Sequence, residues 1–448
     1  MKQKKRYRIL ATLLSVMLLI GLMPAAAFAA GTTATVQING TRLADETPVQ
    51  CGEGTAVLDA QNQTLTLDHA TIEQSGANIP LRIDSGNLTV ILVGENKITS
   101  VDQRPLYGGS ADIIIQSTDG SGTLTIESDY DGLQLDNSNL TIDGCTVKVF
   151  NNSDNPYSVG IAANYDPVYA PDKGVLCIQN GANVTAYGKL LGISGGKSLS
   201  ITDSVVEATA DAAEANAIYV DGTLAITNSS VTANTLSEQS YPAIYAKLDA
   251  VFTDSKMTVS ANGDVALFSP KTFTIEDSLV YVTAPSGKDA IRGNGGTSIT
   301  GSWVETKGGP VNEKAVLTDS AVFMDNVGTV TGSLTLPGDV EVTKDMALTI
   351  PAGASLTVPN GKSFTNHGTI TLEGAFVRET GSIIVCDNHT GGTATSDAQA
   401  VCAICGTPYG SLLPPETGNS DNSMQWVAFL LVSGATGILV FRKKKQMN

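Results

Sequence analysis

Three cysteines and one histidine near the C-terminal end of the chain have the types and the spacing of a metal site. Cys386 stands three positions before His389, Cys402 stands three positions before Cys405, and twelve residues separate the two pairs. Three thiolates and one imidazole at these intervals suit tetrahedral zinc. We expect a structural zinc site in a zinc-ribbon-like unit of residues 386–410. A disulfide and an inert remnant are the alternatives.

Three aspartates are candidates for binding calcium at turns. Asp131 and Asp289 each come directly before a small residue followed by an aliphatic one, and Asp129 is close to Asp131 in the chain. Clustered carboxylates repel each other unless a proton or a cation lies between them. Calcium takes about six to eight oxygen ligands, which carboxylates and turn carbonyls can supply. The alternative is that these residues are solvated turn acids.

Aromatic side chains recur at one position of a repeated block. The block that begins with Ala217 reads AIYVDGTLAITNSSVTAN, and similar blocks begin at Ala243, Ala266 and Ala290. Their third residues include Tyr219, Tyr245 and Phe268, which the alternation of polar and apolar residues directs outward. A row of such rings at strand spacing, about 4.8 Å, predicts a strip that binds polysaccharide. The alternative is that the rings only stack on each other.

The elements that position these residues follow from the same repeat. The second position of the block is aliphatic and recurs at intervals of 23 to 30 residues. These residues are Leu81, Leu106, Leu133, Ile161, Leu191, Ile218, Ile244, Leu267 and Ile291. Each repeat shows two short strands with period-two alternation, and a unit of this size must stack on its neighbours to bury its apolar face. We expect an all-β, right-handed parallel β-helix over 30–325, continued by plainer coils over 326–385. A β-sandwich is the alternative.

The pattern argues against an enzyme and against a nucleic-acid partner. The outward Arg82 and Arg292 lie eight repeats apart and cannot share a lyase site. A polar Asp or Asn that precedes Ser in several repeats, as at Asp254 and Asp277, indicates a ladder of turns rather than one catalytic pair. Cys145 occupies the Ser position of this turn. The net charge of −17 disfavours nucleic acid.

Both ends of the chain carry targeting features. Residues 1–29 have basic residues, an apolar stretch and small residues before a cleavage point, which predicts a secretory signal peptide. A linker over 411–423 precedes an apolar segment over 424–441, expected to span a membrane, and a basic tail over 442–448. The order resembles the sortase sorting signal of Gram-positive surface proteins. That resemblance implies recognition of Pro415, Thr417 and Gly418, cleavage after Thr417, and attachment to peptidoglycan.

The repeats also resemble a carbohydrate-binding β-helix family of Gram-positive surface proteins. The resemblance covers roughly residues 52–309 and rests on the style of the repeat, especially SDYDGLQLDNSNLTIDGCTVKV. The stretch HTGGTAT before Cys-x2-Cys-Gly is similar to small Cys/His modules of bacterial surface proteins. Together these imply a cell-wall-anchored protein that binds polysaccharide without catalysis, with calcium bound to the rod. A structural spacer or adhesin stalk is the alternative, followed by a polysaccharide-degrading enzyme.

Overall fold

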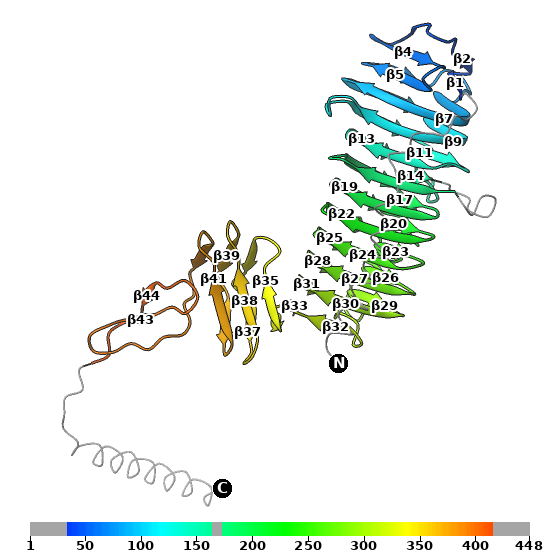
Figure 1. Ribbon diagram of the computed structural model, residues 1–448. Helices are drawn as coiled ribbons and strands as arrows, with labels where there is room; N and C mark the ends of the chain where they lie inside the picture. Colours follow the sequence, from blue (N-terminus) through cyan, green and yellow to red (C-terminus); the bar gives the residue numbers. More distant parts are fainter. Residues whose placement is uncertain (1–33, 164–172, 415–448) are drawn as a thin grey trace, which may run out of the picture. The chain divides into compact units, whose positions relative to one another are not determined.

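The computed structural model describes residues 34–163 and 173–414. The described chain forms two compact units, which divide between Val385 and Cys386. The first unit is an all-β parallel solenoid of about 12 turns, in which successive coils stack in chain order (Figure 1). The predicted fold class, a parallel β-solenoid, is therefore confirmed. The predicted signal peptide, sorting motif and membrane segment lie outside the described residues.

The solenoid has two large sheets and two small ones. The strands of the 22-stranded sheet are β1 (Thr35–Ile38), β2 (Thr41–Arg42), β3 (Val49–Cys51), β4 (Gly54–Asp59), β5 (Thr64–Asp68), β7 (Leu81–Val93), β9 (Leu106–Ser117), β11 (Leu133–Asp136), β12 (Leu140–Asp143), β14 (Val159–Ala163), β15 (Val175–Gln179), β17 (Leu191–Gly195), β18 (Ser198–Thr202), β20 (Asn216–Val220), β21 (Thr223–Thr227), β23 (Ile244–Ala246), β24 (Ala250–Thr253), β26 (Leu267–Ser269), β27 (Thr272–Glu276), β29 (Ile291–Gly293), β30 (Gly296–Thr300) and β32 (Val316–Thr318).

The strands of the 14-stranded sheet are β6 (Thr71–Glu73), β8 (Glu95–Ser100), β10 (Thr123–Ser128), β13 (Thr146–Asn151), β16 (Asn183–Gly188), β19 (Val205–Ala210), β22 (Ser230–Thr235), β25 (Lys256–Ser260), β28 (Leu279–Thr283), β31 (Trp303–Lys307), β33 (Ser320–Met324), β34 (Val327–Thr331), β37 (Ala347–Ile350) and β40 (Thr369–Leu372). The small sheets contain β35 (Ser333–Thr335), β38 (Ser355–Val358) and β41 (Ala375–Arg378), and β36 (Val340–Val342), β39 (Ser363–Asn366) and β42 (Ile383–Cys386).

Most coils of the solenoid contribute three strands, not the two that the repeat predicts. The coil that begins at Asn216 forms β20 and β21 in the larger sheet and β22 in the 14-stranded sheet. The third strand has the same alternation, with Val231 and Ala233 buried. The repeat analysis did not separate this third strand from the second, because the Ser that turns the chain is short and the alternation resumes at once.

The predicted inward column is present, with one correction. Ile161 pairs with Ile193, which in turn pairs with Ile218, so Ile193 and not Leu191 belongs to the column. Leu191 lies two residues earlier and pairs with Val159 and Asn216. The members of the column from Leu81 to Ile291 are fully buried. Like residues therefore stack on like residues through the core, which is how short repeats bury a continuous apolar interior.

A ladder of turns joins the second and third strands of successive coils. Asp203, Asn228, Asp254, Asp277 and Asp319 all have positive φ, between 47° and 50°. The Ser that follows each of them is buried, and from Ser229 onward its hydroxyl accepts a hydrogen bond from the backbone N–H of the equivalent Ser one coil earlier, as Ser229 N donates to Ser255 Oγ at 3.2 Å. Asp and Asn tolerate this conformation better than other non-glycine residues. The interpretation of these acids as a turn ladder is thus confirmed.

The chain changes course at the end of the repeat region. β33 and β34 form an antiparallel hairpin, after which β37 and β40 continue the 14-stranded sheet in parallel. Trp303 and Phe323 project from the outer face of this sheet, yet both are fully buried, with ring centres 4.9 Å apart. Aromatic packing outside the main core thus accompanies the transition to the coils over 326–385.

The second unit is short and has little regular structure. Its described part contains the end of β42 and the two-residue strands β43 (Ala400–Val401) and β44 (Pro408–Tyr409), which pair antiparallel. In the part of the chain that the structure describes, no helix has the length and apolarity to cross a membrane.

Candidate functional site

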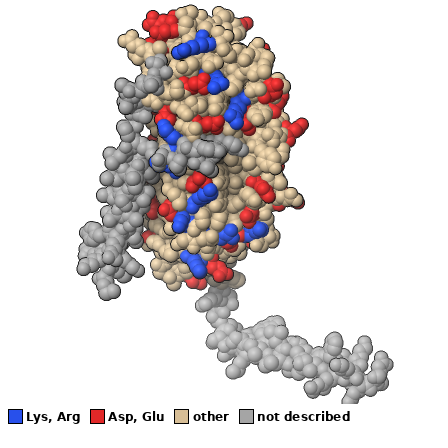
Figure 2. Space-filling model, turned by 90° about the vertical axis from the view of Figure 1, so that its right-hand side faces the viewer, with Lys and Arg blue, Asp and Glu red and all other residues tan. Residues whose placement is uncertain are grey.

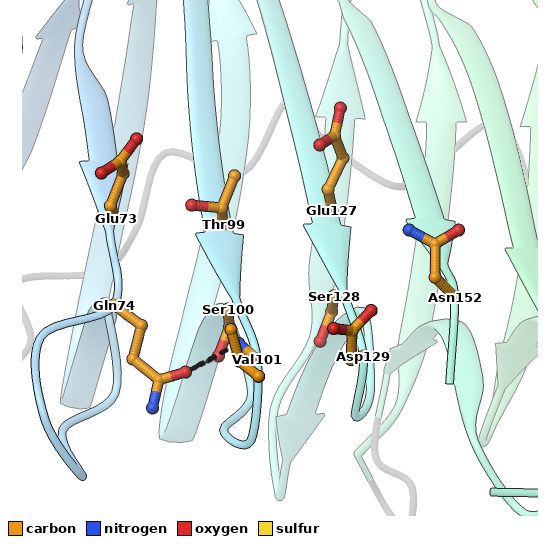
Figure 3. A pocket seen from close by; sticks show the side chains of 9 residues that line it. All are labelled: Glu73, Gln74, Thr99, Ser100, Val101, Glu127, Ser128, Asp129 and Asn152. Carbon is orange, nitrogen blue, oxygen red and sulfur yellow. Dashed lines mark hydrogen bonds between the residues drawn. The ribbon is translucent and has the colours of Figure 1, made fainter. Parts of the chain in front are cut away.

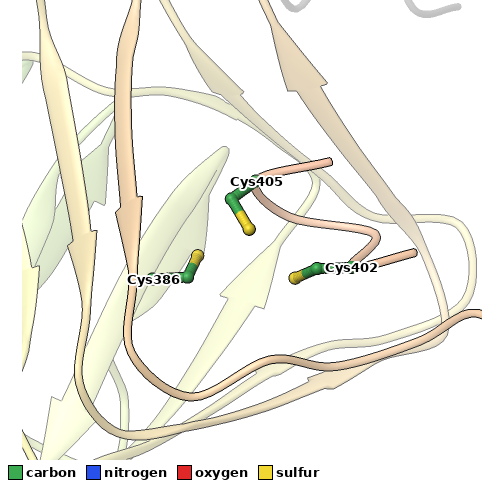
Figure 4. A group of neighbouring side chains, drawn as sticks. All are labelled: Cys386, Cys402 and Cys405. Atoms are coloured by element: carbon green, nitrogen blue, oxygen red, sulfur yellow. The ribbon is translucent and has the colours of Figure 1, made fainter. Parts of the chain in front are cut away.

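Three cysteine thiols converge in the second unit. Cys386 is the last residue of β42, whereas Cys402 and Cys405 belong to the turn between β43 and β44. Their Sγ atoms all lie within 4.8 Å of one another, and Figure 4 shows the three sulfurs directed toward a common centre. Among the described residues, these three cysteines form the group of potential metal ligands that lies close enough together to hold a metal ion.

His389 lies next to the thiol group. Its Nδ1 atom is 3.5 Å from Cys405 Sγ. Its ring packs on the ring of Tyr409 with centres 5.1 Å apart, and the Tyr409 hydroxyl donates to the carbonyl of Gly391. The segment after His389 is also fixed by a backbone hydrogen bond from Ala403 N to Thr390 O of 2.8 Å. Of the four residues predicted from spacing, the three cysteines therefore converge, and His389 lies beside one of them, Cys405.

The environment of the sulfurs differs from one cysteine to the next. Burial raises the pKa of Cys386, and the neighbouring Cys405 sulfur raises it further. Burial also acts to raise the pKa of Cys402, but backbone N–H groups, that of Cys405 first, stabilise its thiolate and lower the pKa overall. All six cysteines are free thiols. Three sulfurs so close together repel one another as thiolates, which a cation relieves.

The aromatic residues on the solenoid form a column, called here the aromatic ladder (Tyr219, Tyr245 and Phe268). They are in register on β20, β23 and β26 and are half-buried. The rings of Tyr219 and Tyr245 are stacked, with centres 5.5 Å apart and planes at 9°, and Phe268 follows at 5.5 Å with planes at 43°. The predicted alignment is present. The rings also cover part of each other's faces, as the alternative interpretation required.

Charged side chains lie next to the first and the last ring of the aromatic ladder. The Arg292 guanidinium lies over the Phe268 ring at 4.6 Å, and Lys247 Nζ is 5.9 Å from the centre of the Tyr219 ring. The Tyr219 hydroxyl donates to Asp221 Oδ1 at 3.0 Å, and burial raises the pKa of this phenol. The sequence analysis missed Asp221 and Lys247, although both stand two positions after a ladder residue, on the same outward face.

Three basic side chains beside the aromatic ladder have carboxylate partners. Lys247 pairs with Asp221, Lys288 with Asp264 at 3.1 Å, and Arg292 with Asp289 at 3.8 Å. Figure 2 shows one face of the molecule on which basic and acidic side chains lie side by side rather than in patches of one sign. The ladder therefore lies in a surface that is charged but locally neutralised.

Tyr107 does not extend the aromatic ladder. Tyr107 lies four coils before Tyr219, and the equivalent positions of the three coils between them hold Gln134, Ala162 and Ser194. It forms a separate cluster with Arg82 and Arg104, whose guanidinium groups lie 5.8 Å and 5.3 Å from its ring centre.

The structure does not bring the three predicted calcium ligands together. Asp131 and Asp289 occupy equivalent places six coils apart, about 29 Å at the usual strand spacing. Asp131 accepts a hydrogen bond from Val159 N and lies 3.6 Å from Arg104, whereas Asp289 pairs with Arg292. Asp129 is exposed. Asp131 is neutralised by Arg104 of the preceding coil, a contact that spacing along the chain cannot reveal, whereas Asp289 pairs with Arg292 three residues later in its own coil.

A pocket of about 340 Å³ lies on the outer face of the 14-stranded sheet. Figure 3 shows Glu73 and Glu127 on either side of Thr99, two strands apart. This places their backbones about 9.5 Å apart, near the upper limit for inverting glycosidases. Glu73 is exposed and Glu127 pairs with Lys97 at 2.9 Å, whereas a general acid needs surroundings that favour its protonated form.

Comparisons of the chain with protein-family models, with curated proteins and with solved structures find no match. No family and no sorting signal are identified by them, and the resemblances stated above remain expectations.

Proposed function

We propose that the solenoid is a non-catalytic binding rod for a neutral polysaccharide and that the chain is displayed on the cell surface. The observation that supports the proposal is the aromatic ladder, whose half-buried rings repeat every 5.5 Å on one outward face. This interval is on the scale of one sugar ring. Tyrosine adds a hydroxyl that can bond to sugar hydroxyls at the edge of an apolar surface.

The ion pairs around the ladder favour an uncharged ligand. An acidic glycan would need basic side chains that are free to pair with its carboxylates, but Lys247, Lys288 and Arg292 already have acidic partners. The net charge of −17 adds a general repulsion for anionic chains. A neutral glycan can contact the ring edges and hydroxyls without breaking these ion pairs and without electrostatic repulsion.

The test is retention of the protein in native gels that contain soluble polysaccharide. The variant Tyr219→Ala/Tyr245→Ala should lose at least about tenfold in affinity for the retaining neutral glycan, since two ring contacts are lost together. The variant Tyr130→Ala/Tyr157→Ala, which removes two exposed aromatic side chains outside the ladder, is the matched control. Equal retention of the ladder variant and the parent, with both folded by circular dichroism, would refute the ladder as the binding site.

A structural spacer is the second candidate, and one observation favours it. The Tyr219 and Tyr245 rings stack on each other nearly parallel. Under the spacer interpretation, this stacking shields and stiffens the outer strand surface and has no further role. Under this function no neutral or acidic polysaccharide retains the protein in the same gels, and the ladder variant changes only the stability of the solenoid.

Surface display rests on the expected signal peptide and on the motif with Pro415, Thr417 and Gly418. By the resemblance to sorting signals, sortase is the processing partner and peptidoglycan the attachment site. Replacing Thr417 by Ala should move the protein from the peptidoglycan fraction to the membrane or the medium. Unchanged retention in peptidoglycan would exclude this attachment.

We also propose that the thiol group binds zinc, with His389 as the fourth ligand. A sulfur about 2.3 Å and a nitrogen about 2.0 Å from one tetrahedral zinc lie about 3.5 Å apart. This is the separation of Cys405 Sγ and His389 Nδ1. Protein atoms then fill all four positions, so the zinc has a structural role.

Elemental analysis and cobalt substitution test the zinc site. We expect one zinc per chain, and a cobalt(II) spectrum with intense tetrahedral bands and thiolate charge transfer. His389→Ala should weaken these bands and His389→Cys should preserve tetrahedral binding, whereas His367→Ala, the control, should change neither. A chain that contains no zinc and has fewer than six titratable thiols would show a disulfide instead.

A further inference from the structure

The second unit has almost no apolar core. From Cys386 to the end of the described chain, the buried hydrophobic residues are Ala400, Cys402 and Ile404. The two strands of the unit have two residues each. Units below about 40 residues cannot bury enough apolar surface to offset the entropy of ordering the chain, unless disulfides, metals or association supply the difference.

Several backbone hydrogen bonds of the unit lie around the thiol group. Ala403 N donates to Thr390 O at 2.8 Å, Cys402 N donates to Thr407 O at 3.0 Å, and Gly406 N donates to Cys402 O at 2.9 Å. These bonds hold the loop around the sulfurs, but a typical hydrogen bond contributes little net stability. Cys386 and Cys402 are far apart in the chain, so their approach closes the long loop between them.

We infer that residues 386–413 form a metal-folded unit, ordered when the thiol group and His389 hold their metal and unfolded when the metal is removed. The inference rests on the proposed zinc site. Metal binding to such a unit is coupled to folding, because the ligands are brought together only in the folded chain. The solenoid, with its continuous core of buried side chains, does not depend on the metal.

The test is hydrogen–deuterium exchange of the full chain, purified in detergent under reducing conditions, before and after zinc is removed by a chelator. Peptides from residues 395–410 should lose all measurable protection on removal of zinc and regain it when zinc is added back. Peptides from residues 216–235 in the solenoid should not change. Cys402→Ser should show the same loss without chelator, and Cys177→Ser, outside the thiol group, should exchange like the parent.

The outcomes separate this inference from the zinc site itself. If elemental analysis shows that zinc was present and has been removed while residues 395–410 stay protected, the metal-folded unit is wrong and the zinc site stands. If the parent chain contains no zinc, both fail. Protection that appears only when the chain is purified without a reductant would assign the fold to a disulfide and overturn the inference.

Discussion

The solenoid and the second unit, called here the Cys/His unit (described residues 386–414), are stabilised in opposite ways. In the solenoid each coil repeats the same inward columns and the same serine ladder, so stability is spread over many similar contacts between neighbouring coils. In the Cys/His unit the contacts gather around three sulfurs and one imidazole. A defect in the solenoid should therefore be local and graded, and a defect in the Cys/His unit should remove its structure entirely.

The largest graded effect is expected from a large cavity in the solenoid core. Phe252 is fully buried and packs edge-on against Phe273 of the next coil with ring centres 5.0 Å apart. Phe252→Ala should lower the free energy of unfolding by about 3–5 kcal/mol, measured by denaturant titration. The zinc content and the exchange protection of residues 395–410 should not change, because the two units are stabilised independently.

Val251→Ala is the control for this variant, since Val251 lies next to Phe252 but is only half-buried on the outer side. Loss of zinc together with the solenoid core in Phe252→Ala would contradict the independence of the two units.

A smaller effect is expected from the serine ladder. In Ser255→Ala the buried N–H of Ser229 loses its acceptor, Ser255 Oγ, and the carbonyl of Thr253 loses a donor. A buried group left without a partner costs about 1–3 kcal/mol. Thermal unfolding should show this loss, and Thr258→Ala, an exposed position on the neighbouring strand β25, should show almost none. Equal stability of the two variants would mean that the ladder contributes nothing.

The smallest effect concerns a carboxylate near the end of the repeat region. Burial raises the pKa of Glu305, the hydrogen bond from Trp303 Nε1 partly offsets this, and Glu341 raises it further. Because the folded pKa is above the unfolded one, ionisation of Glu305 disfavours folding, and stability rises as the pH falls through the folded pKa. Glu305→Gln keeps an acceptor for Trp303 and should stabilise the protein at pH 7 by less than about 1 kcal/mol.

The gain from Glu305→Gln should vanish below about pH 4, where Glu305 is protonated in both states. Urea titrations of parent and variant at the two pH values measure it. A destabilised variant at pH 7 would show that the ionised Trp303–Glu305 hydrogen bond outweighs the cost of burying the charge.

Repetition explains why the inward columns of the solenoid could be predicted while the ion pairs on its outer surface could not. Ile218, Ile244 and Leu267 recur at the same place in successive repeats, and stacked repeats put equivalent residues in register. The one misplaced member, Leu191, stands in a repeat that has two aliphatic candidates, and only strand pairing selects Ile193. The Cys/His group could be predicted because its ligands are specified by residue type and short spacing.

The sequence by itself determined the parallel solenoid, the outward row of aromatic rings and the convergence of Cys386, Cys402 and Cys405. Each of these depends on local alternation, on repetition or on short-range spacing. Only the tertiary structure decided that Asp131 pairs with Arg104 and that Lys247 pairs with Asp221 beside the ladder. Such pairs join side chains from different coils, and their energies depend on distances that no repeat specifies, because the outward residues vary freely while the inward ones must stack.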